Sequence, residues 1–166
     1  MEGYGEVWVI SPDWANVQVD SVGNSFTLHG NSRMYFASRA TNGFEADAYW
    51  QTELMNKRFI YSIDVSNVDC HCNAAAYFIN MPGNNAGDGD YYCDANFGNS
   101  IWCPEYDTYE GNKHTMAGTL HTCDGGNGYW NSCDRSGCQT NVYNLDSNVM
   151  CPESRLDKWS EFYHKQ

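Results

Sequence analysis

Short segments rich in β-branched and aromatic residues recur along this chain, and turn-forming residues bound each of them. Such segments are typical of strands, and their regular recurrence predicts an all-β protein, an antiparallel β-sandwich. In the segment from Arg58 to Val65 every odd position is apolar, whereas Ser62 and Asp64 interrupt the even positions. This alternation predicts one core face and one wetter face. The other predicted strands are Glu6 to Ile10, Asn16 to Asp20, Ser25 to His29, Met34 to Ser38 and Ala74 to Met81.

The length and the C-terminal stretch suggest how the chain is organised. Its 166 residues fit one domain, so residues 1–166 are expected to form a single unit. From Pro152 to Gln166 the apolar residues follow helical spacing, which predicts a short C-terminal helix that begins at the proline. Nowhere does the sequence approach the roughly 20 apolar residues that a membrane-spanning helix needs. The apolar residues of the predicted helix are Leu156, Trp159, Phe162 and Tyr163.

Two stretches consist largely of turn-forming residues and are expected to be exposed loops. One is PGNNAGDGD, from Pro82 to Asp90, and the other runs from Cys123 to Cys138. Asp88 and Asp90 offer oxygen ligands, but a calcium loop needs more of them than this segment supplies. A plain surface turn is the preferred interpretation.

The composition excludes some partners and favours others. Nine basic residues against twenty-one acidic ones give a formal charge of -12, which repels nucleic acid and anionic membrane surfaces. Aromatic residues make up 15% of the chain, and flat rings suit stacking on sugar faces, although packing of a β-core also explains them. A neutral polysaccharide is therefore the predicted partner.

Eight cysteines point to an oxidising compartment and to a secreted, extracellular protein held by bridges. Zinc binding is the competing use of cysteine, and Cys70, His71 and Cys72 resemble a ligand cluster. Their one-residue spacings do not match the two-to-four-residue ligand loops of structural zinc sites. No metal and no cofactor are predicted.

Three acids lie within six residues in the segment CPEYDTYE, at Glu105, Asp107 and Glu110. On a strand, Glu105 and Asp107 project from the same face. Glu110 is an odd number of residues from Glu105, so a bulge or bend near Thr108 and Tyr109 is needed to return it to that face. Retaining hydrolysis of a glycosidic bond uses two such carboxyl groups about 5 Å apart.

Mutual repulsion among these acids in a partly desolvated site would raise at least one pKa, which keeps a carboxylic acid protonated for acid catalysis. An acidic strand that faces solvent would give the same spacing, because short acidic triplets arise by chance.

The wider context of the acids resembles a known family. CPEYDTYEGN is similar to the C-x-E-x-D-x-x-E-x-N signature of family-seven glycoside hydrolases, the cellobiohydrolase and endoglucanase group. His121-Thr122-Cys123 stands where that family has His-x-Cys, and YYCD, ending at Asp94, matches its Tyr-Cys-Asp. Tyr77-Phe78 resembles its Tyr-Phe motif, and CQTNVYN, from Cys138, resembles its Cys-x-x-Asn-x-Tyr. The resemblance runs through about residues 20–145, which is about the N-terminal half of a usual member.

The resemblance implies a β-jelly roll with a concave glucan-binding face. Glu105 would be the nucleophile, Glu110 the general acid/base, and Asp107 the residue that positions and tunes Glu105. The residues implied in substrate binding are His121, Tyr77, Tyr92, Asp94 and Tyr109.

The resemblance, with short loops that suit bridge geometry, also implies two disulfides. They would join Cys93 to Cys103 and Cys123 to Cys133. The pairing of the remaining four cysteines stays open; these are Cys70, Cys72, Cys138 and Cys151.

Several departures from the family pattern shape the expected function. Tyr109 stands in place of the family's Trp, and Gly111 in place of its Ala. The loops that roof a cellobiohydrolase tunnel are short or absent, which favours an open cleft. The family's second half has no counterpart here, so an exposed sheet edge would need cover from residues 152–166, from another subunit by self-association, or from a complementing chain.

The predicted function is that of a retaining, endo-acting β-1,4-glucan hydrolase. The alternative is a catalytically incomplete extracellular structural, assembly or glycan-binding protein derived from such an enzyme. Laminarinase-like families also use E-x-D-x-x-E on a bulged strand, but they lack the cysteine context of this chain.

Overall fold

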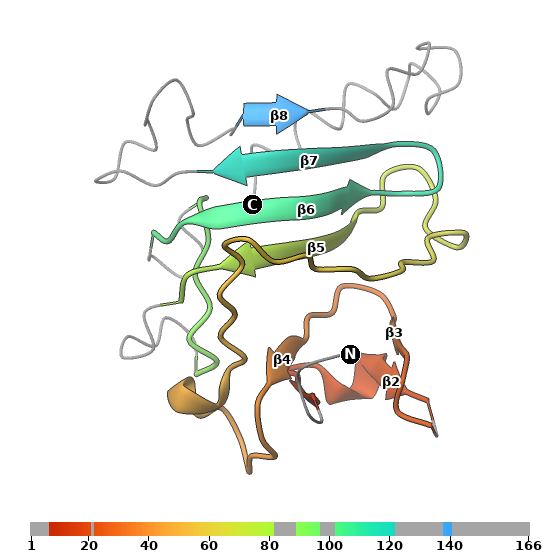
Figure 1. Ribbon diagram of the computed structural model, residues 1–166. Coiled ribbons are helices and arrows are strands. Elements are labelled where there is room, and N and C mark those ends of the chain that lie inside the picture. Colours follow the sequence, from red (N-terminus) through yellow and green to blue (C-terminus); the bar gives the residue numbers. More distant parts are fainter. Residues whose placement is uncertain (1–6, 21, 82–88, 97–101, 122–137, 141–166) are drawn as a thin grey trace. The chain divides into compact units, whose positions relative to one another are not determined.

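The protein is described by a computed structural model that covers residues 7–20, 22–81, 89–96 and 102–121 and the backbone of 138–140 (Figure 1). Contacts group the chain into two compact units: Met1–Ile60 with Gly83–Tyr91, and Tyr61–Pro82 with Tyr92–Gln166. Every described strand pairs antiparallel with its neighbours, which confirms the predicted all-β class. The jelly roll and the single domain stay predictions.

The first unit holds two pairs of short strands. β1 (Trp8–Ile10) pairs with β4 (Tyr35–Ala37), and β2 (Val17–Val19) pairs with β3 (Phe26–Leu28). Two 3-10 helices, η1 (Trp14–Asn16) and η2 (Ala46–Ala48), lie in the connections. Each strand falls inside a segment predicted from the sequence. The buried apolar residues of this unit are Ile10, Ala37, Ala48 and Tyr49.

The end of the predicted Pro82–Asp90 loop is not exposed. Asp90 is only 2% exposed, and its Oδ2 lies 2.6 Å from Arg33 Nη2 and accepts a 2.7 Å hydrogen bond from the Tyr35 hydroxyl. A buried carboxylate needs such partners, because an unpaired charge in the interior is costly. The expectation of a surface turn is wrong at Asp90, and residues 82–88 lie outside the described part of the chain.

The second unit contains a four-stranded sheet. Its strands are β5 (Ala74–Ile79), β6 (Glu105–Gly111), β7 (Met116–His121) and β8 (Cys138–Thr140), in the order β5-β6-β7-β8 (Figure 1). β6 therefore lies between two partners along its length. The register sets Glu105 opposite His121 on β7 and Asp107 opposite Tyr77 on β5.

A β-bulge interrupts β6. On the β5 side, Tyr77 faces Asp107 and Ala76 faces Tyr109, so Thr108 is the extra residue. The Thr108 hydroxyl donates to the Ala76 carbonyl at 2.7 Å. Its only proton is used there, so the Tyr61 hydroxyl, 2.9 Å away, is the donor in their mutual hydrogen bond. The bulge predicted near Thr108 and Tyr109 is confirmed.

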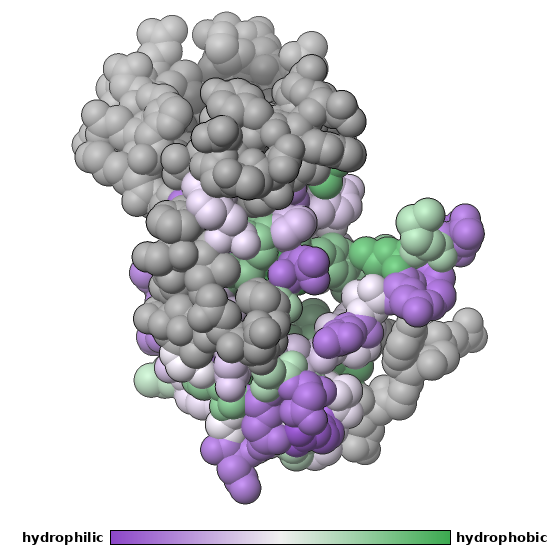
Figure 2. All heavy atoms as spheres, turned by 90° about the vertical axis from the view of Figure 1, so that its left-hand side faces the viewer, coloured by the Kyte–Doolittle hydropathy of each residue, from purple (hydrophilic) through white to green (hydrophobic). Residues whose placement is uncertain are grey.

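The strand predicted from Arg58 to Val65 is wrong, because this segment forms no ladder. Ile60 is 74% exposed, and Tyr61 and Ile63 are exposed as well. Alternating apolar residues favour an extended chain, but a strand also needs a neighbour to accept its backbone hydrogen bonds. Figure 2 shows apolar side chains in green among hydrophilic ones in purple on the described surface.

No helix among the described residues has both the length and the apolar character needed to cross a membrane. The predicted C-terminal helix, the predicted cover of a sheet edge by residues 152–166, and most of the loop from Cys123 to Cys138 lie outside those residues.

The turn between β6 and β7 generates a stability prediction. A Cβ at Gly111 would lie 2.2 Å from the Thr115 carbonyl oxygen and 2.8 Å from Met116 Cα, both backbone atoms. Gly111→Ala should therefore lower the free energy of unfolding by about 2 kcal/mol, measured by chemical denaturation. Gly118→Ala is the matched control, because its Cβ would meet nothing closer than 3.5 Å. Equal losses in the two variants would contradict the steric account.

The bulge generates a second prediction. Thr108→Val keeps the shape of the side chain but leaves the Ala76 carbonyl without this donor. We expect a loss of roughly 1–2 kcal/mol in the free energy of unfolding, whereas Thr108→Ser should recover most of it. A valine variant as stable as the serine variant would show that the hydroxyl does not hold the bulge.

Candidate active site

Three carboxyl groups gather on one face of β6. Glu105 and Asp107 are two residues apart and share this face, as predicted; they are 9% and 2% exposed. Glu110 is half-buried and hydrogen-bonds Asp107. The extra residue Thr108 returns the Glu110 side chain to the face of the strand that carries Asp107. The acids therefore do not form a solvent-facing acidic strand.

Glu105 is held by the backbone of a neighbouring loop. The Ala95 N–H donates to Glu105 Oε2 at 2.9 Å. This loop is fixed by the disulfide between Cys93 and Cys103, whose Cα atoms are 5.8 Å apart, and by the Cys103 N–H, which donates to the Asp94 carbonyl at 3.2 Å. The predicted bridge is present, whereas Cys123 and Cys133 lie outside the described residues.

The other two carboxyls have side-chain partners. His121 Nε2 lies 2.9 Å from Asp107 Oδ2, and both side chains are almost fully buried. Asn73 Nδ2 donates to Glu110 Oε1 at 3.1 Å. Each of the three acids therefore has a different orienting partner, supplied by β7 or by a loop beside the sheet.

These surroundings shift the acidity of the two glutamates in the same direction. Burial is the main cause that raises the pKa of Glu105, and the negative charge of Asp107 adds to it. The pKa of Glu110 is also raised, first by burial and then by Asp107.

Each glutamate accepts one hydrogen bond that opposes the rise of its pKa, and Glu110 has a further one that adds to the rise. The Ala95 N–H opposes the rise at Glu105, because a donor favours the ionised form. The hydrogen bond between Glu110 and Asp107 adds to the rise, because Asp107 accepts from the protonated acid. The Asn73 amide opposes the rise at Glu110 in the same way, because it also donates. What distinguishes Glu110 is that it also has an acceptor, Asp107, for the proton of its acid form.

Of the residues implied in substrate binding, His121 lies opposite Glu105 in the sheet, and three more lie near Glu105. The Tyr77 hydroxyl donates to the Tyr92 hydroxyl at 3.4 Å. Burial raises the pKa of Tyr92, and Tyr77, Asp94 and Glu105 raise it further through their charges. Asp94 is buried as well, and its Oδ1 accepts from the Asn96 N–H at 2.8 Å. Polar groups thus continue the site beyond the three acids.

Tyr109 is placed differently from these residues. It is 8% exposed, and its hydroxyl donates to the Asn112 carbonyl at 3.4 Å. This tyrosine therefore contacts the β6–β7 turn next to it.

Two contacts of the site were not foreseen from the sequence. Ala95 acts through its backbone N–H, which no residue pattern reveals. Asn73 precedes β5 and follows two cysteines, and nothing in its spacing indicates a contact with Glu110.

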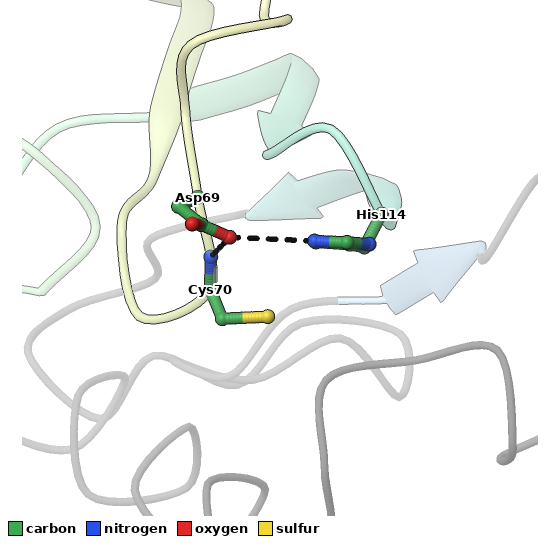
Figure 3. A group of neighbouring side chains, drawn as sticks. All are labelled: Asp69, Cys70 and His114. Carbon is green, nitrogen blue, oxygen red and sulfur yellow. Dashed lines mark hydrogen bonds and ion pairs between the residues drawn. The ribbon is translucent and has the colours of Figure 1, made fainter.

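A second cluster, Asp69, Cys70 and His114, lies beside the β6–β7 turn (Figure 3). Its ligand atoms lie within 4.8 Å of one another. Cys70 is disulfide-bonded, however, so its sulfur is not available as a thiolate ligand. Asp69 Oδ1 instead accepts from the Cys70 N–H at 2.8 Å and lies 3.3 Å from Lys113 Nζ. This cluster is an anchor of the turn.

The chain is similar to fungal proteins that are named as glucanases. It is 29% identical over 170 aligned residues to a protein from Aspergillus terreus named probable endo-beta-1,4-glucanase celB, covering 80% of this chain and 40% of that protein. A protein of the same name from Aspergillus clavatus is 28% identical over 130 residues, covering 61% of this chain and 31% of that protein. The chain thus spans less than half the length of these relatives. No solved structure matches it.

The family model described as glycosyl hydrolase family 7 matches residues 2–101. That match covers more than half of the chain and ends just before the strand that carries the three acids. By this match the chain belongs to glycosyl hydrolase family 7.

Proposed function

We propose that this chain carries the catalytic carboxylates of a retaining, endo-acting β-1,4-glucan hydrolase. The observation that carries the proposal is the group of Glu105, Asp107 and Glu110 on one face of β6, in which a backbone N–H donates to Glu105 and Glu110 shares a hydrogen bond with Asp107. Membership of family 7 and the names of the two relatives support the substrate class. We also propose that the protein is secreted and that it binds the glucan in an open cleft.

In the first step the Glu105 carboxylate attacks the anomeric carbon, and the bond to the leaving-group oxygen breaks. Glu110 gives its proton to that oxygen. In the second step Glu110, now ionised, takes a proton from water while the water oxygen attacks the anomeric carbon and Glu105 leaves. Two carboxyls with different protonation states are what this sequence of steps requires.

The remaining residues act on these two groups. Asp107, held by His121, keeps a negative charge beside Glu110 and thereby favours its proton. The Ala95 N–H orients Glu105 and favours its charge. Tyr77, Tyr92 and Asp94 are proposed to contact the sugar next to Glu105.

A specific observation favours the alternative function. The segment from Arg58 to Val65 is patterned as a strand but forms no ladder, and β5 and β8 have no second strand neighbour among the described residues. Unpaired edges favour strand addition. The alternative is therefore a catalytically incomplete extracellular assembly or glycan-binding protein, which self-associates or pairs with a complementing chain.

Two substitutions separate the proposed roles. Glu105→Gln should abolish turnover of every glycoside, because no covalent intermediate can form. Glu110→Gln should lose hydrolysis of glucan by about 10²-fold or more, yet keep glycosylation by an activated aryl glycoside, whose leaving group needs little protonation. Added azide should rescue the second step in this variant alone.

The measurement is reducing-sugar release from soluble β-1,4-glucan, together with aryl-glycoside kinetics. A folded wild-type protein that hydrolyses neither β-1,4- nor β-1,3-glucan would refute the hydrolase and leave the alternative.

The raised pKa of Glu110 predicts how stability depends on pH. A carboxyl whose pKa is raised by folding opposes folding once the unfolded chain ionises. Stability is therefore lost as the pH rises from about 4.5 towards about 7. Glu110→Gln should remove this part of the loss and raise the free energy of unfolding at neutral pH by roughly 2 kcal/mol.

Chemical denaturation at pH 4.5 and pH 7.5 tests this expectation. Glu53→Gln is the control, because the Glu53 side chain is exposed and its Oε2 lies 3.8 Å from Lys57 Nζ. If Glu110 were solvated, the free energy of unfolding would change with pH in the same way in both variants.

A further inference from the structure

Asn73 immediately precedes β5, and the sheet register places it beside Glu110. The Cα partner of Glu110 on β5 is Ala75, two residues further on. The backbone next to Asn73 is held in place, because the Cys72 carbonyl accepts a 3.3 Å hydrogen bond from Asn112 Nδ2. The position of Asn73 is therefore set by the sheet, and its side-chain torsions are what can still change.

The Asn73 amide is satisfied at one end. Nδ2 donates to Glu110 Oε1 at 3.1 Å, whereas Oδ1 is out of solvent and has no hydrogen-bond partner among the described residues. A buried acceptor without a partner is costly, and native proteins keep such atoms where they have a use. Because only one end is bonded, no second hydrogen bond locks the amide in its present orientation.

The hydrogen-bonding needs of Glu110 change during the proposed reaction. As a carboxylate it only accepts hydrogen bonds, and as a carboxylic acid it also has an O–H to donate. An asparagine amide carries a donor and an acceptor that exchange places by a half-turn about the Cβ–Cγ bond. The present orientation fits the ionised acid, and the turned orientation fits the protonated one.

We propose that Asn73 is a positioning residue whose amide turns to follow the proton of Glu110, donating to its carboxylate and accepting from its acid. The catalytic consequence rests on the function proposed above. Asn73 itself gains and loses no proton, since Glu110 gives one to the glycosidic oxygen and regains one from water. The charged and titratable groups that also act on Glu110 are Asp107 from β6 and His121 from β7.

Nuclear magnetic resonance can test the turn without any activity. Above the midpoint of Glu110 ionisation, the Asn73 amide protons should show cross-relaxation with the Glu110 Cγ protons. Below the midpoint this signal should be lost, because Oδ1 then faces the acid. The resonance is assigned by its absence in Asn73→Leu. Glu110→Gln should abolish the pH dependence of this signal. That result would assign the pH dependence to Glu110 and not to Asp107 or His121. Cross-relaxation that persists at both pH values would overturn the proposal.

Kinetics of the two steps test the catalytic consequence. Asn73→Leu has nearly the same volume and no amide, so both glycosylation and deglycosylation should slow by about tenfold. Asn73→Asp offers acceptors and a negative charge, so it should favour protonated Glu110 and slow deglycosylation more than glycosylation.

A leucine variant that slows deglycosylation alone, or neither step, would mean that the amide is a fixed donor or has no role, and would overturn the inference. Wild-type protein without activity would refute the proposed function, while the cross-relaxation measurement would still decide whether the amide turns.

Discussion

The arrangement of the candidate site depends on one irregularity of the backbone, the extra residue Thr108 in β6. A regular strand would send Glu105 and Glu110 to opposite faces of the sheet, because side chains alternate with a period of two. The bulge removes this conflict and leaves the Ala76 carbonyl on β5 beside the extra residue. The Thr108 hydroxyl satisfies that carbonyl, so the residue that creates the irregularity also compensates for it.

Part of this arrangement could be predicted from the sequence, because it follows from counting residues along a strand. The shared face of Glu105 and Asp107, and the need for a bulge before Glu110, come from strand periodicity alone. The partners Ala95 and Asn73 could not be predicted in this way. One acts through its backbone, and the other depends on how a loop ends against β5, which is a property of tertiary packing.

The error at Arg58 to Val65 has a related cause. Alternation of apolar residues reports what a segment would bury as a strand, but pairing depends on a neighbour elsewhere in the chain. The shorter strands β1 to β4 were predicted correctly, since each found its partner within the first unit. The prediction of an exposed turn at Asp90 failed for the opposite reason. Its sequence neighbours are turn-formers, yet Arg33, which is distant in the sequence, holds it in the interior. Local composition therefore predicts strands and turns only where tertiary pairing agrees with it.

Electrostatics connects this geometry to the chemistry. Burial alone would raise the pKa of both glutamates together, and two equally protonated acids could not divide the roles of nucleophile and acid. Donors oppose this rise at both glutamates, the Ala95 N–H at Glu105 and the Asn73 amide at Glu110. The difference between them is the Asp107 carboxylate, which hydrogen-bonds Glu110. The Cys93–Cys103 disulfide fixes the loop that supplies the N–H, and the bulge brings the acceptor within reach. The proposed division of roles between two chemically identical side chains thus depends on the neighbours that the bulge and the loops place beside them.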